Sequence, residues 1–356
     1  MDNNIFDFGK SELTHDAIIS WIINGFNYKE TAEELYDISI QFIKLMDSNF
    51  SFELYNKVEI KNQFNIKINT NNIDGNSINK RGRIDIFAIF SGPNGKYYLI
   101  IEDKVFSGEN GNQFVEYIEA IENNQDLMDG NKKFVNIILG NYPEYYIEKV
   151  RKNGWEVVNR KEILKLLPVY DSYHTPELSL LRYYRNYLDK LDKDYSSYMT
   201  TKDLNNWTRF AILGFFSDLI SEYENSDFGI INNRNGGFCG LWFKKEEIVT
   251  SDLLKYNIYL QLEFTPNNKS EWFISVKLED LLYTSASINK ARTLKAELFR
   301  LLNDGFEEVR YSKGSHLTVG KKNVKSEELE SLKKEISDSF NSLNLVLRKL
   351  NIVFNK

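Results

Sequence analysis

The sequence predicts an α/β domain with a mixed sheet flanked by helices, followed by an α+β domain with an antiparallel sheet. Over the first half of the chain, short β-branched or aromatic runs alternate with amphipathic helical segments, an order typical of mixed α/β sheets. The second half contains four strand-like runs in succession, which is typical of an antiparallel meander. A long amphipathic stripe close to the end of the chain predicts a closing helix.

The first half supplies the elements of the mixed sheet. Ser11 is suited to begin the first helix, because its hydroxyl can accept a hydrogen bond from the first turn. The predicted helices cover residues 11–26, 29–46, 113–121, 143–152 and 176–191. The predicted strands cover residues 52–60, 63–68, 83–90, 97–105, 133–139 and 155–158. Residues 69–82 are polar, and we expect a loop or a hairpin tip there.

A chain of 356 residues is too long for one ordinary core, so we expect two domains. A shift from charged to polar residues near Tyr198 predicts the boundary between them. The predicted domains are 1–198 and 199–356. The helices of the second domain cover residues 203–223, 290–302 and 329–350, and its strands cover 229–232, 237–243, 256–264, 272–278, 307–311 and 317–320. No motif in this half indicates chemistry, so we assign it to recognition of substrate or of a partner, with a homodimer or a partner protein as the possible contact.

Composition narrows the class of protein. Hydrophobic residues make up 42% and charged residues 27%, which is typical of a soluble globular protein. The apolar runs are too short to span a membrane, and the start lacks the pattern of a signal peptide, so we expect a cytoplasmic protein. The single cysteine, Cys239, excludes an internal disulfide and a four-cysteine zinc or iron–sulfur site. A net charge of −6 argues against a general polyanion binder and leaves room for a local basic groove.

The hairpin formed by residues 83–90 and 97–105 carries charges inside an apolar pattern. Both runs are apolar on both faces, which is typical of strands in the middle of a covered sheet. The charged side chains that interrupt the pattern are Asp85, Glu102 and Lys104. Burial of an unpaired carboxylate is costly, so these charges call for a partner or a function.

Alternation along the second strand puts Glu102 and Lys104 on one face and Asp103 on the other. Asp85 on the neighbouring strand meets them if the register allows. Two carboxylates from adjacent strands suit Mg²⁺, and a nearby lysine can orient or deprotonate water or offset charge on a phosphate. The chemistry indicated is metal-assisted phosphodiester hydrolysis. The alternative is a buried Glu102–Lys104 ion pair with Asp85 in a strand-end turn, and the spacing leaves it open.

The helix that follows carries Gln113 and Tyr117 on one face, since residues four apart are neighbours on a helix. The order Asp85, Glu102-x-Lys104, Gln113-x-x-x-Tyr117 resembles the PD-(D/E)XK nuclease superfamily, in particular its RecB-like branch. The resemblance covers roughly the first half of the chain and implies a restriction-endonuclease-like core.

The resemblance also implies a role for each matching position. Asp85 and Glu102 hold Mg²⁺ or Mn²⁺, the backbone carbonyl of Asp103 adds a ligand, and Lys104 serves the nucleophile. Gln113 and Tyr117 steady the strands of the site or the nucleic acid. The implied catalytic set is Asp85, Glu102, Lys104, Gln113 and Tyr117. One position departs from the motif, because Ile84 stands where the family has proline.

The first helix offers a further candidate metal ligand. In the superfamily an acid of the first helix reaches the metal, and Glu12 occupies the matching opening. The alternative is a surface acid in the first turn, where the helix dipole favours negative charge. We expect Glu12, His15 and Asp16 to lie together at the exposed end of the helix.

Lys80, Arg81 and Arg83 come directly before Asp85 in the sequence. They are candidate contacts for the phosphates beside the scissile bond. The alternative is that these charged residues only flank the start of a strand and bind nothing, and the sequence does not decide between these two interpretations.

We therefore expect a Mg²⁺- or Mn²⁺-dependent nuclease whose partner is nucleic acid, DNA first, in the restriction or phage-defence setting that the resemblance implies. One alternative is a catalytically silent nuclease fold retained as a binding or scaffold module. The intact set of Asp85, Glu102 and Lys104 argues against that alternative. A ribonuclease that uses the same site is another alternative.

Overall fold

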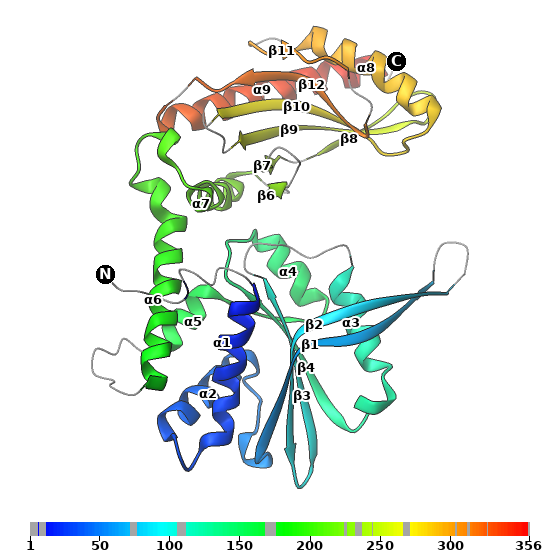
Figure 1. Cartoon of the computed structure of the whole chain (residues 1–356). Helices are drawn as coiled ribbons and strands as arrows, with labels where there is room; N and C mark the ends of the chain where they lie inside the picture. Colours follow the sequence, from blue (N-terminus) through cyan, green and yellow to red (C-terminus); the bar gives the residue numbers. More distant parts are fainter. Residues whose placement is uncertain are drawn as a thin grey trace. The chain divides into compact units, whose positions relative to one another are not determined.

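The chain forms two compact units, Met1–Lys193 and Asp194–Lys356, each with its own sheet (Figure 1). The helix α6 (Pro176–Ser196) contains the point at which the units divide. The structure is a computed structural model, and it describes residues 6, 12–71, 77–104, 112–167, 176–223, 226–231, 237–243, 245–265, 271–302, 305–311, 314–325 and 327–354.

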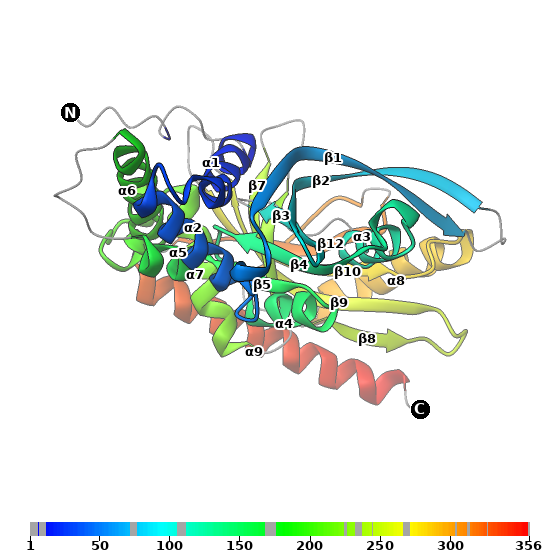
Figure 2. The same cartoon turned by 90° about the horizontal axis from the view of Figure 1, so that it is seen from below.

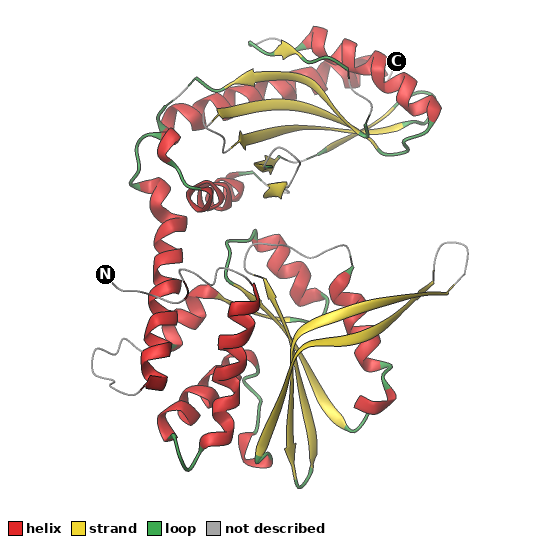
Figure 3. Cartoon of the chain, in the orientation of Figure 1, coloured by secondary structure: helices red, strands yellow, loops and turns green. Residues whose placement is uncertain are grey.

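The first unit is organised on a five-stranded sheet with the strand order β1-β2-β3-β4-β5 (Figure 3). β1 pairs antiparallel with β2 and β2 with β3, whereas β3 and β4, and β4 and β5, pair parallel. The strands are β1 (Lys57–Asn71), β2 (Ser77–Gly92), β3 (Gly95–Lys104), β4 (Gly130–Ile138) and β5 (Glu156–Asn159). The helices are α1 (Glu12–Asn24), α2 (Glu33–Met46), α3 (Gln113–Glu122), α4 (Glu144–Lys152) and α5 (Arg160–Leu166), together with α6. The mixed sheet with flanking helices confirms the predicted fold class.

Two groups of helices cover opposite faces of this sheet (Figures 1 and 2). On one face, Phe114 of α3 and Val150 of α4 are buried in a cluster with Ile100 of β3. On the other face, Phe26, just after α1, packs edge-on against Phe90 of β2 with 5.2 Å between ring centroids. β3 is therefore covered on both sides, which explains its continuous apolar run.

β1 and β2 form a long ribbon that bends away from the other strands (Figure 1). The bend lies at Gln63, whose φ of 55° is in the left-handed region that side chains rarely adopt. Asn62 pairs with Ile86 and Phe64 pairs with Ile84, so Gln63 lies opposite Asp85 at a break in the ladder. The missing pair between Gln63 and Asp85 therefore lies where the ribbon starts to bend.

The side chains of β1 change faces at this bend. Asn62 accepts a hydrogen bond from Ser20 of α1, whereas Phe64 stacks on Phe87 on the face covered by α3. Residues two apart on a regular strand share a face, so the left-handed residue Gln63 reverses the alternation. One ribbon can therefore pack against α1 before the bend and against α3 after it.

Two predicted boundaries in this unit are wrong. Residues 52–54 form a short 3-10 turn, and the first strand begins at Lys57 and continues through the second predicted strand. Residues 69–71 and 77–82, predicted as a loop or a hairpin tip, belong to the paired strands β1 and β2. The backbone ladder of an antiparallel pair forms whether or not its side chains are polar, so polarity was a poor guide here.

The second unit is an antiparallel sheet with the order β11-β12-β10-β9-β7-β6 and β8 paired to β9 (Figure 3). Its strands are β6 (Asp227–Ile231), β7 (Phe238–Trp242), β8 (Glu246–Val249), β9 (Lys255–Thr265), β10 (Glu271–Asp280), β11 (Glu307–Glu308) and β12 (His316–Asn323). Its helices are α7 (Arg209–Leu219), α8 (Ser285–Leu301) and α9 (Leu329–Phe354). Residues of all three helices join the buried face of the sheet in one core, which confirms the predicted α+β class.

The opening helix of this unit is shorter than predicted. Thr208 caps α7, because its side chain accepts a hydrogen bond from the N–H of Ala211. Trp207 is extended and ends the preceding 3-10 turn, so the predicted helix 203–223 is interrupted there. Among the described helices of both units, none has the length and apolarity that a membrane crossing requires.

Candidate active site

β3 ends in three charged residues that are almost fully buried. Glu102, Asp103 and Lys104 are 2%, 0% and 6% exposed. The Nζ atom of Lys104 lies 2.7 Å from Oε1 of Glu102, so these two side chains share the face covered by α3. Asp103 acts on the opposite side: burial, and then the charge of Asp103, raise the pKa of Tyr184 on α6 well above its ordinary value.

Asp85 lies where the ladder between β2 and β3 ends. Ile86 and Ile101 are the last paired residues, so the next position on each strand sets Asp85 opposite Glu102. The strands do not pair there; instead Oδ2 of Asp85 accepts a hydrogen bond of 2.9 Å from the backbone N–H of Asp103. The side chain of Asp85 thus replaces a backbone acceptor and holds two acids of neighbouring strands at one point of the sheet.

Glu102 is held in a way that disfavours its charge. Burial raises the pKa of Glu102 to about 7, against the lowering effect of Lys104 and with a further increase from Asp85. Oε1 accepts hydrogen bonds from Lys104 and Gln113, whereas Oε2 is buried without a hydrogen-bond partner in the described part of the chain. A buried carboxylate oxygen without a donor is costly, and a bound cation would remove that cost.

The helix α3 ties β3 to β2. Nε2 of Gln113 lies 2.6 Å from Oε1 of Glu102 and 3.0 Å from the hydroxyl of Tyr117. The hydroxyl of Tyr117 donates to the backbone carbonyl of Arg83 at 3.1 Å. The ring of Tyr117 reaches β2 because residue 82 is glycine: a Cβ on Gly82 would lie 2.8 Å from that ring. The pair four residues apart on α3 therefore clamps both strands of the site.

Gln63 links the bend of β1 to two acids. Its Nε2 donates to Oδ2 of Asp16 at 3.0 Å and to Oδ1 of Asp85 at 3.3 Å. Asp16 comes from α1 and is 2% exposed. A strained backbone at Gln63, held in place by contacts to both acids, is typical of a functional site. Neither Gln63 nor Asp16 was among the site residues predicted from the sequence.

The prediction that Glu12, His15 and Asp16 lie together at the exposed end of the first helix is wrong for His15 and Asp16. His15 and Asp16 are buried, and burial lowers the pKa of His15 to about 4. The helical period explains this outcome, because Asp16 shares a face with the buried residues Ile19 and Ile23. That spacing was the available signal for Asp16. The side chain of Glu12, the predicted ligand from this helix, lies outside the described residues.

Asn136 of β4 is a further polar residue that sequence reasoning missed. It is in register with Glu102 on the neighbouring strand and is fully buried. Within the described residues, neither polar atom of its amide has a hydrogen-bond partner, and Oε1 of Gln113 has none either. Polar atoms of Glu102, Gln113 and Asn136 are thus left with bonding capacity that the described residues do not satisfy.

The geometry agrees with the comparison of the sequence with known families. A sequence model of the PD-(D/E)XK nuclease superfamily matches residues 3–215, which is more than half of the chain. The chain belongs to that superfamily. The match confirms the predicted superfamily, while its RecB-like branch stays a prediction. No curated protein and no solved structure matches the chain.

Membership in the PD-(D/E)XK superfamily indicates a nuclease-type function, a nucleic acid as binding partner, and a divalent metal as the usual cofactor. Asp85 and the free oxygen of Glu102 fit such an ion, because both are hard oxygen donors. Among the described residues, no group of three or more histidine, cysteine, aspartate or glutamate side chains is arranged to hold a metal ion. Mg²⁺ usually takes one or two protein carboxylates together with water and substrate oxygens, so two acids are sufficient for such a site. A role for the carbonyl of Asp103 stays a prediction.

All three predicted phosphate contacts lie on β2, including Lys80 and Arg81, which were expected in the loop or hairpin tip. Lys80, on β2, forms an ion pair of 2.8 Å with Glu116 of α3. Arg81 and Arg83 are exposed on β2, and Lys67 of β1 lies directly opposite Arg81. Arg81 and Arg83 are two apart, so the ribbon presents them with Lys67 on one face. The ammonium of Lys80 is already paired with Glu116, unlike the exposed side chains of Arg81 and Arg83 in the described part of the chain.

Proposed function

We propose that this PD-(D/E)XK protein is a Mg²⁺- or Mn²⁺-dependent nuclease that hydrolyses phosphodiester bonds in DNA. The observation that carries the proposal is the state of Glu102, which is buried beside Asp85 and has one oxygen without a partner among the described residues. A setting in restriction or phage defence is part of the proposal and rests on the family alone.

Asp85 and Glu102 are the residues that would hold the ion. When bound, a divalent ion supplies positive charge to the scissile phosphate and lowers the pKa of a coordinated water. Glu102 then keeps its negative charge near neutral pH in spite of its burial, which otherwise raises its pKa to about 7. Gln63 supports this arrangement through its hydrogen bond to Asp85.

Lys104 is the residue that would act on the nucleophile. Its ammonium lies 2.7 Å from Glu102 and carries three donors, so it can bind Glu102 and still donate to a water or a phosphate oxygen. Gln113 and Tyr117 are positioning residues in this proposal: through their hydrogen bonds they fix Glu102 relative to β2.

Binding of a nucleic acid is supported by the ribbon of β1 and β2. Lys67, Arg81 and Arg83 are exposed on one face of this antiparallel pair, on a chain whose net charge is −6. Arginine side chains bind phosphate groups through paired N–H donors, and such contacts position a nucleic acid without reading its sequence. Arg83 is two residues from Asp85, so these contacts would hold the backbone close to the acids.

The test is cleavage of single- and double-stranded DNA and RNA by the full chain, with Mg²⁺, with Mn²⁺ and with EDTA. We expect cleavage of DNA with metal, none in EDTA, and none by the Asp85→Asn variant, which keeps the side-chain shape and removes the charge. Calorimetric titration with Mg²⁺ should show binding to the wild type and a large loss of affinity in Asp85→Asn.

Each alternative has its own outcome. Cleavage of RNA alone, dependent on Asp85, would replace DNA by RNA and leave the site as proposed. Absence of cleavage together with absence of Mg²⁺ binding would establish the silent binding module instead. Equal activity of the wild type and Asp85→Asn would show that the proposed site is not the catalytic site.

A further inference from the structure

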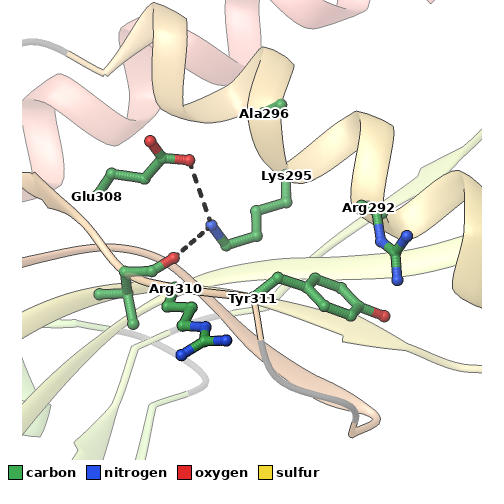
Figure 4. Close-up of a pocket in the computed structure, with 7 residues that line it drawn as sticks. Arg292, Lys295, Ala296, Glu308, Arg310 and Tyr311 are labelled. Atoms are coloured by element: carbon green, nitrogen blue, oxygen red, sulfur yellow. Dashed lines mark hydrogen bonds and ion pairs between the residues drawn. The ribbon is translucent and has the colours of Figure 1, made fainter.

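The second unit contains a cavity of about 470 Å³ between α8 and the segment that follows β11 (Figure 4). This volume lies in the range of small-molecule binding sites. The cavity is far from the acids of the first unit in the sequence. Its lining residues are Arg292, Lys295, Ala296, Glu308, Val309, Arg310 and Tyr311.

The cavity has a surplus of positive charge. Three cationic side chains line it, Arg292, Lys295 and Arg310, against the single carboxylate of Glu308. This surplus of two charges stands out on a chain of net charge −6. A phosphate monoester carries close to two negative charges near neutral pH, whereas a phosphodiester or a carboxylate carries one. The charge of the cavity therefore matches a phosphate monoester best.

Lys295 gives the cavity a fixed cation. Its side chain is 5% exposed, and Nζ lies 2.7 Å from the carbonyl oxygen of Val309 and 3.7 Å from Oε1 of Glu308 (Figure 4). An ammonium has three donors, and these two contacts leave it able to bind a third oxygen. The buried stem and the two anchors hold its position before any ligand arrives.

Two arginines of the lining have no ion pair among the described residues. The guanidinium carbon of Arg292 lies 4.6 Å from the centre of the Tyr311 ring, a cation–π contact that does not use the N–H donors of the guanidinium (Figure 4). Within the described residues, neither Arg292 nor Arg310 forms an ion pair with a carboxylate. Planar guanidinium groups bind phosphate through paired N–H donors.

From these features we infer that the cavity binds the phosphate monoester of a nucleotide, either a free nucleotide or a phosphorylated end of a strand. Lys295, Arg292 and Arg310 of the lining supply the positive charge for the phosphate, and the remaining volume admits the nucleoside. All lining residues belong to the second unit, so binding here does not depend on the proposed metal site.

The experiment is calorimetric titration of the full chain in EDTA, which prevents metal-dependent cleavage. The probes are inorganic phosphate, deoxyadenosine monophosphate, and a short single-stranded oligonucleotide with and without a 5′-phosphate. We expect the double variant Arg292→Gln/Arg310→Gln to lose about tenfold or more in affinity for the phosphorylated probes, since each charge-assisted bond contributes that order. Arg300→Gln, an exposed arginine of α8 outside the cavity, is the matched control and should bind as the wild type does.

The probes decide between the two sources of the phosphate. Tighter binding of the monophosphate identifies a free nucleotide, and tighter binding of the 5′-phosphorylated strand identifies a strand end. Equal binding of the strand with and without its phosphate, together with no binding of the monophosphate, would overturn the inference. An equal loss in Arg300→Gln or the absence of binding by every probe would overturn it as well. Thermal unfolding of each variant verifies that the second unit is folded.

Discussion

Each unit has a sheet on which a glutamate contacts a lysine, and the two glutamates are held differently. In the first unit, Glu102 has one buried oxygen without a partner among the described residues, and burial raises its pKa to about 7. In the second unit, Glu279 of β10 accepts hydrogen bonds from Lys245 and Asn257 at 2.8 and 2.9 Å. Burial acts to raise the pKa of Glu279 as well, but these hydrogen bonds lower it below its ordinary value.

The difference separates two uses of the same residue pair. Glu279 is more exposed and its charge is satisfied by the protein, so its ion pair needs no other function. Glu102 lies beside Asp85, and burial outweighs the stabilising effect of Lys104 and Gln113 on its charge. One of its oxygens also has no partner among the described residues. Perturbed carboxyl groups of the second kind cluster at functional sites. A lysine partner by itself does not distinguish a glutamate of a functional site from a glutamate of a structural ion pair.

The largest expected effect is on cleavage. Glu102→Gln should lower the rate of metal-dependent cleavage by roughly a hundredfold to a thousandfold, because it removes charge where the proposed ion binds. Glu279→Gln makes the same chemical change in the second unit and should cleave close to the wild-type rate. Single-turnover rates at saturating metal measure both. Loss of activity in the two variants alike would contradict the distinction.

The next largest effect concerns Lys104, compared with a partly buried ion pair of the other sheet, Lys277 with Glu263. Lys104→Met should reduce cleavage about a hundredfold and lower the free energy of unfolding at pH 8 by about 3 kcal/mol, since it leaves a buried charge unpaired. The loss of stability should shrink at pH 5, where Glu102 is protonated. Lys277→Met, on β10, is the control, because its partner Glu263 keeps a hydrogen bond from Ser275.

Chemical denaturation of the Lys104→Met and Lys277→Met variants at both pH values checks this prediction. Lys277→Met should show the smaller loss of stability and unchanged cleavage. A loss of stability in Lys104→Met that is independent of pH would mean that packing of the lysine stem, and not the Glu102 charge, is responsible.

Stability in the absence of metal should report the raised pKa of Glu102 directly. The folded pKa of about 7 exceeds the ordinary value of 4.5, so wild-type stability from this group is complete below pH 4.5 and is lost as the pH rises to about 7. Relative to wild type, Glu102→Gln should therefore gain about 3 kcal/mol between pH 4.5 and pH 8 in EDTA.

Glu279→Gln should change in the opposite direction and at lower pH, because the pKa of Glu279 is lowered below 4.5. Its charge stabilises the wild type fully above pH 4.5, so the loss of stability in Glu279→Gln should stay constant up to pH 8 and shrink only below pH 4.5. Unfolding free energies in EDTA at several pH values measure both variants. Parallel pH dependences for the two variants would show that the two glutamates are equivalent. Addition of Mg²⁺ should stabilise the wild type and leave Glu102→Gln unaffected.

The smallest expected effects concern the basic ribbon. Arg81→Gln and Arg83→Gln should each weaken DNA binding and reduce its salt dependence by about one unit of slope, as loss of one phosphate contact does. Lys80→Gln should change binding less, because Lys80 is already paired with Glu116. Filter-binding assays with Ca²⁺ in place of Mg²⁺, across a range of salt concentrations, compare the three variants. Equal effects from all three would mean that general surface charge is responsible.

The fold class could be predicted from the sequence because its signals are local. The apolar runs of β3 and β4, the helical period of α3 and the order of elements are properties of neighbouring residues, and they placed Glu102, Lys104, Gln113 and Tyr117 on the correct types of element. Polar composition misplaced residues 69–71 and 77–82, because the ladder between β1 and β2 depends on a partner strand and not on the segment itself.

By itself the sequence determined the superfamily motif and which side chains alternate on β3, since both follow from chain chemistry and period. Only the tertiary structure decided that Gln63 joins Asp16 to Asp85 and that one oxygen of Glu102 has no donor among the described residues. Those outcomes depend on where a helix and two bent strands meet, and a contact between residues 22 or 47 positions apart leaves no trace in the local pattern.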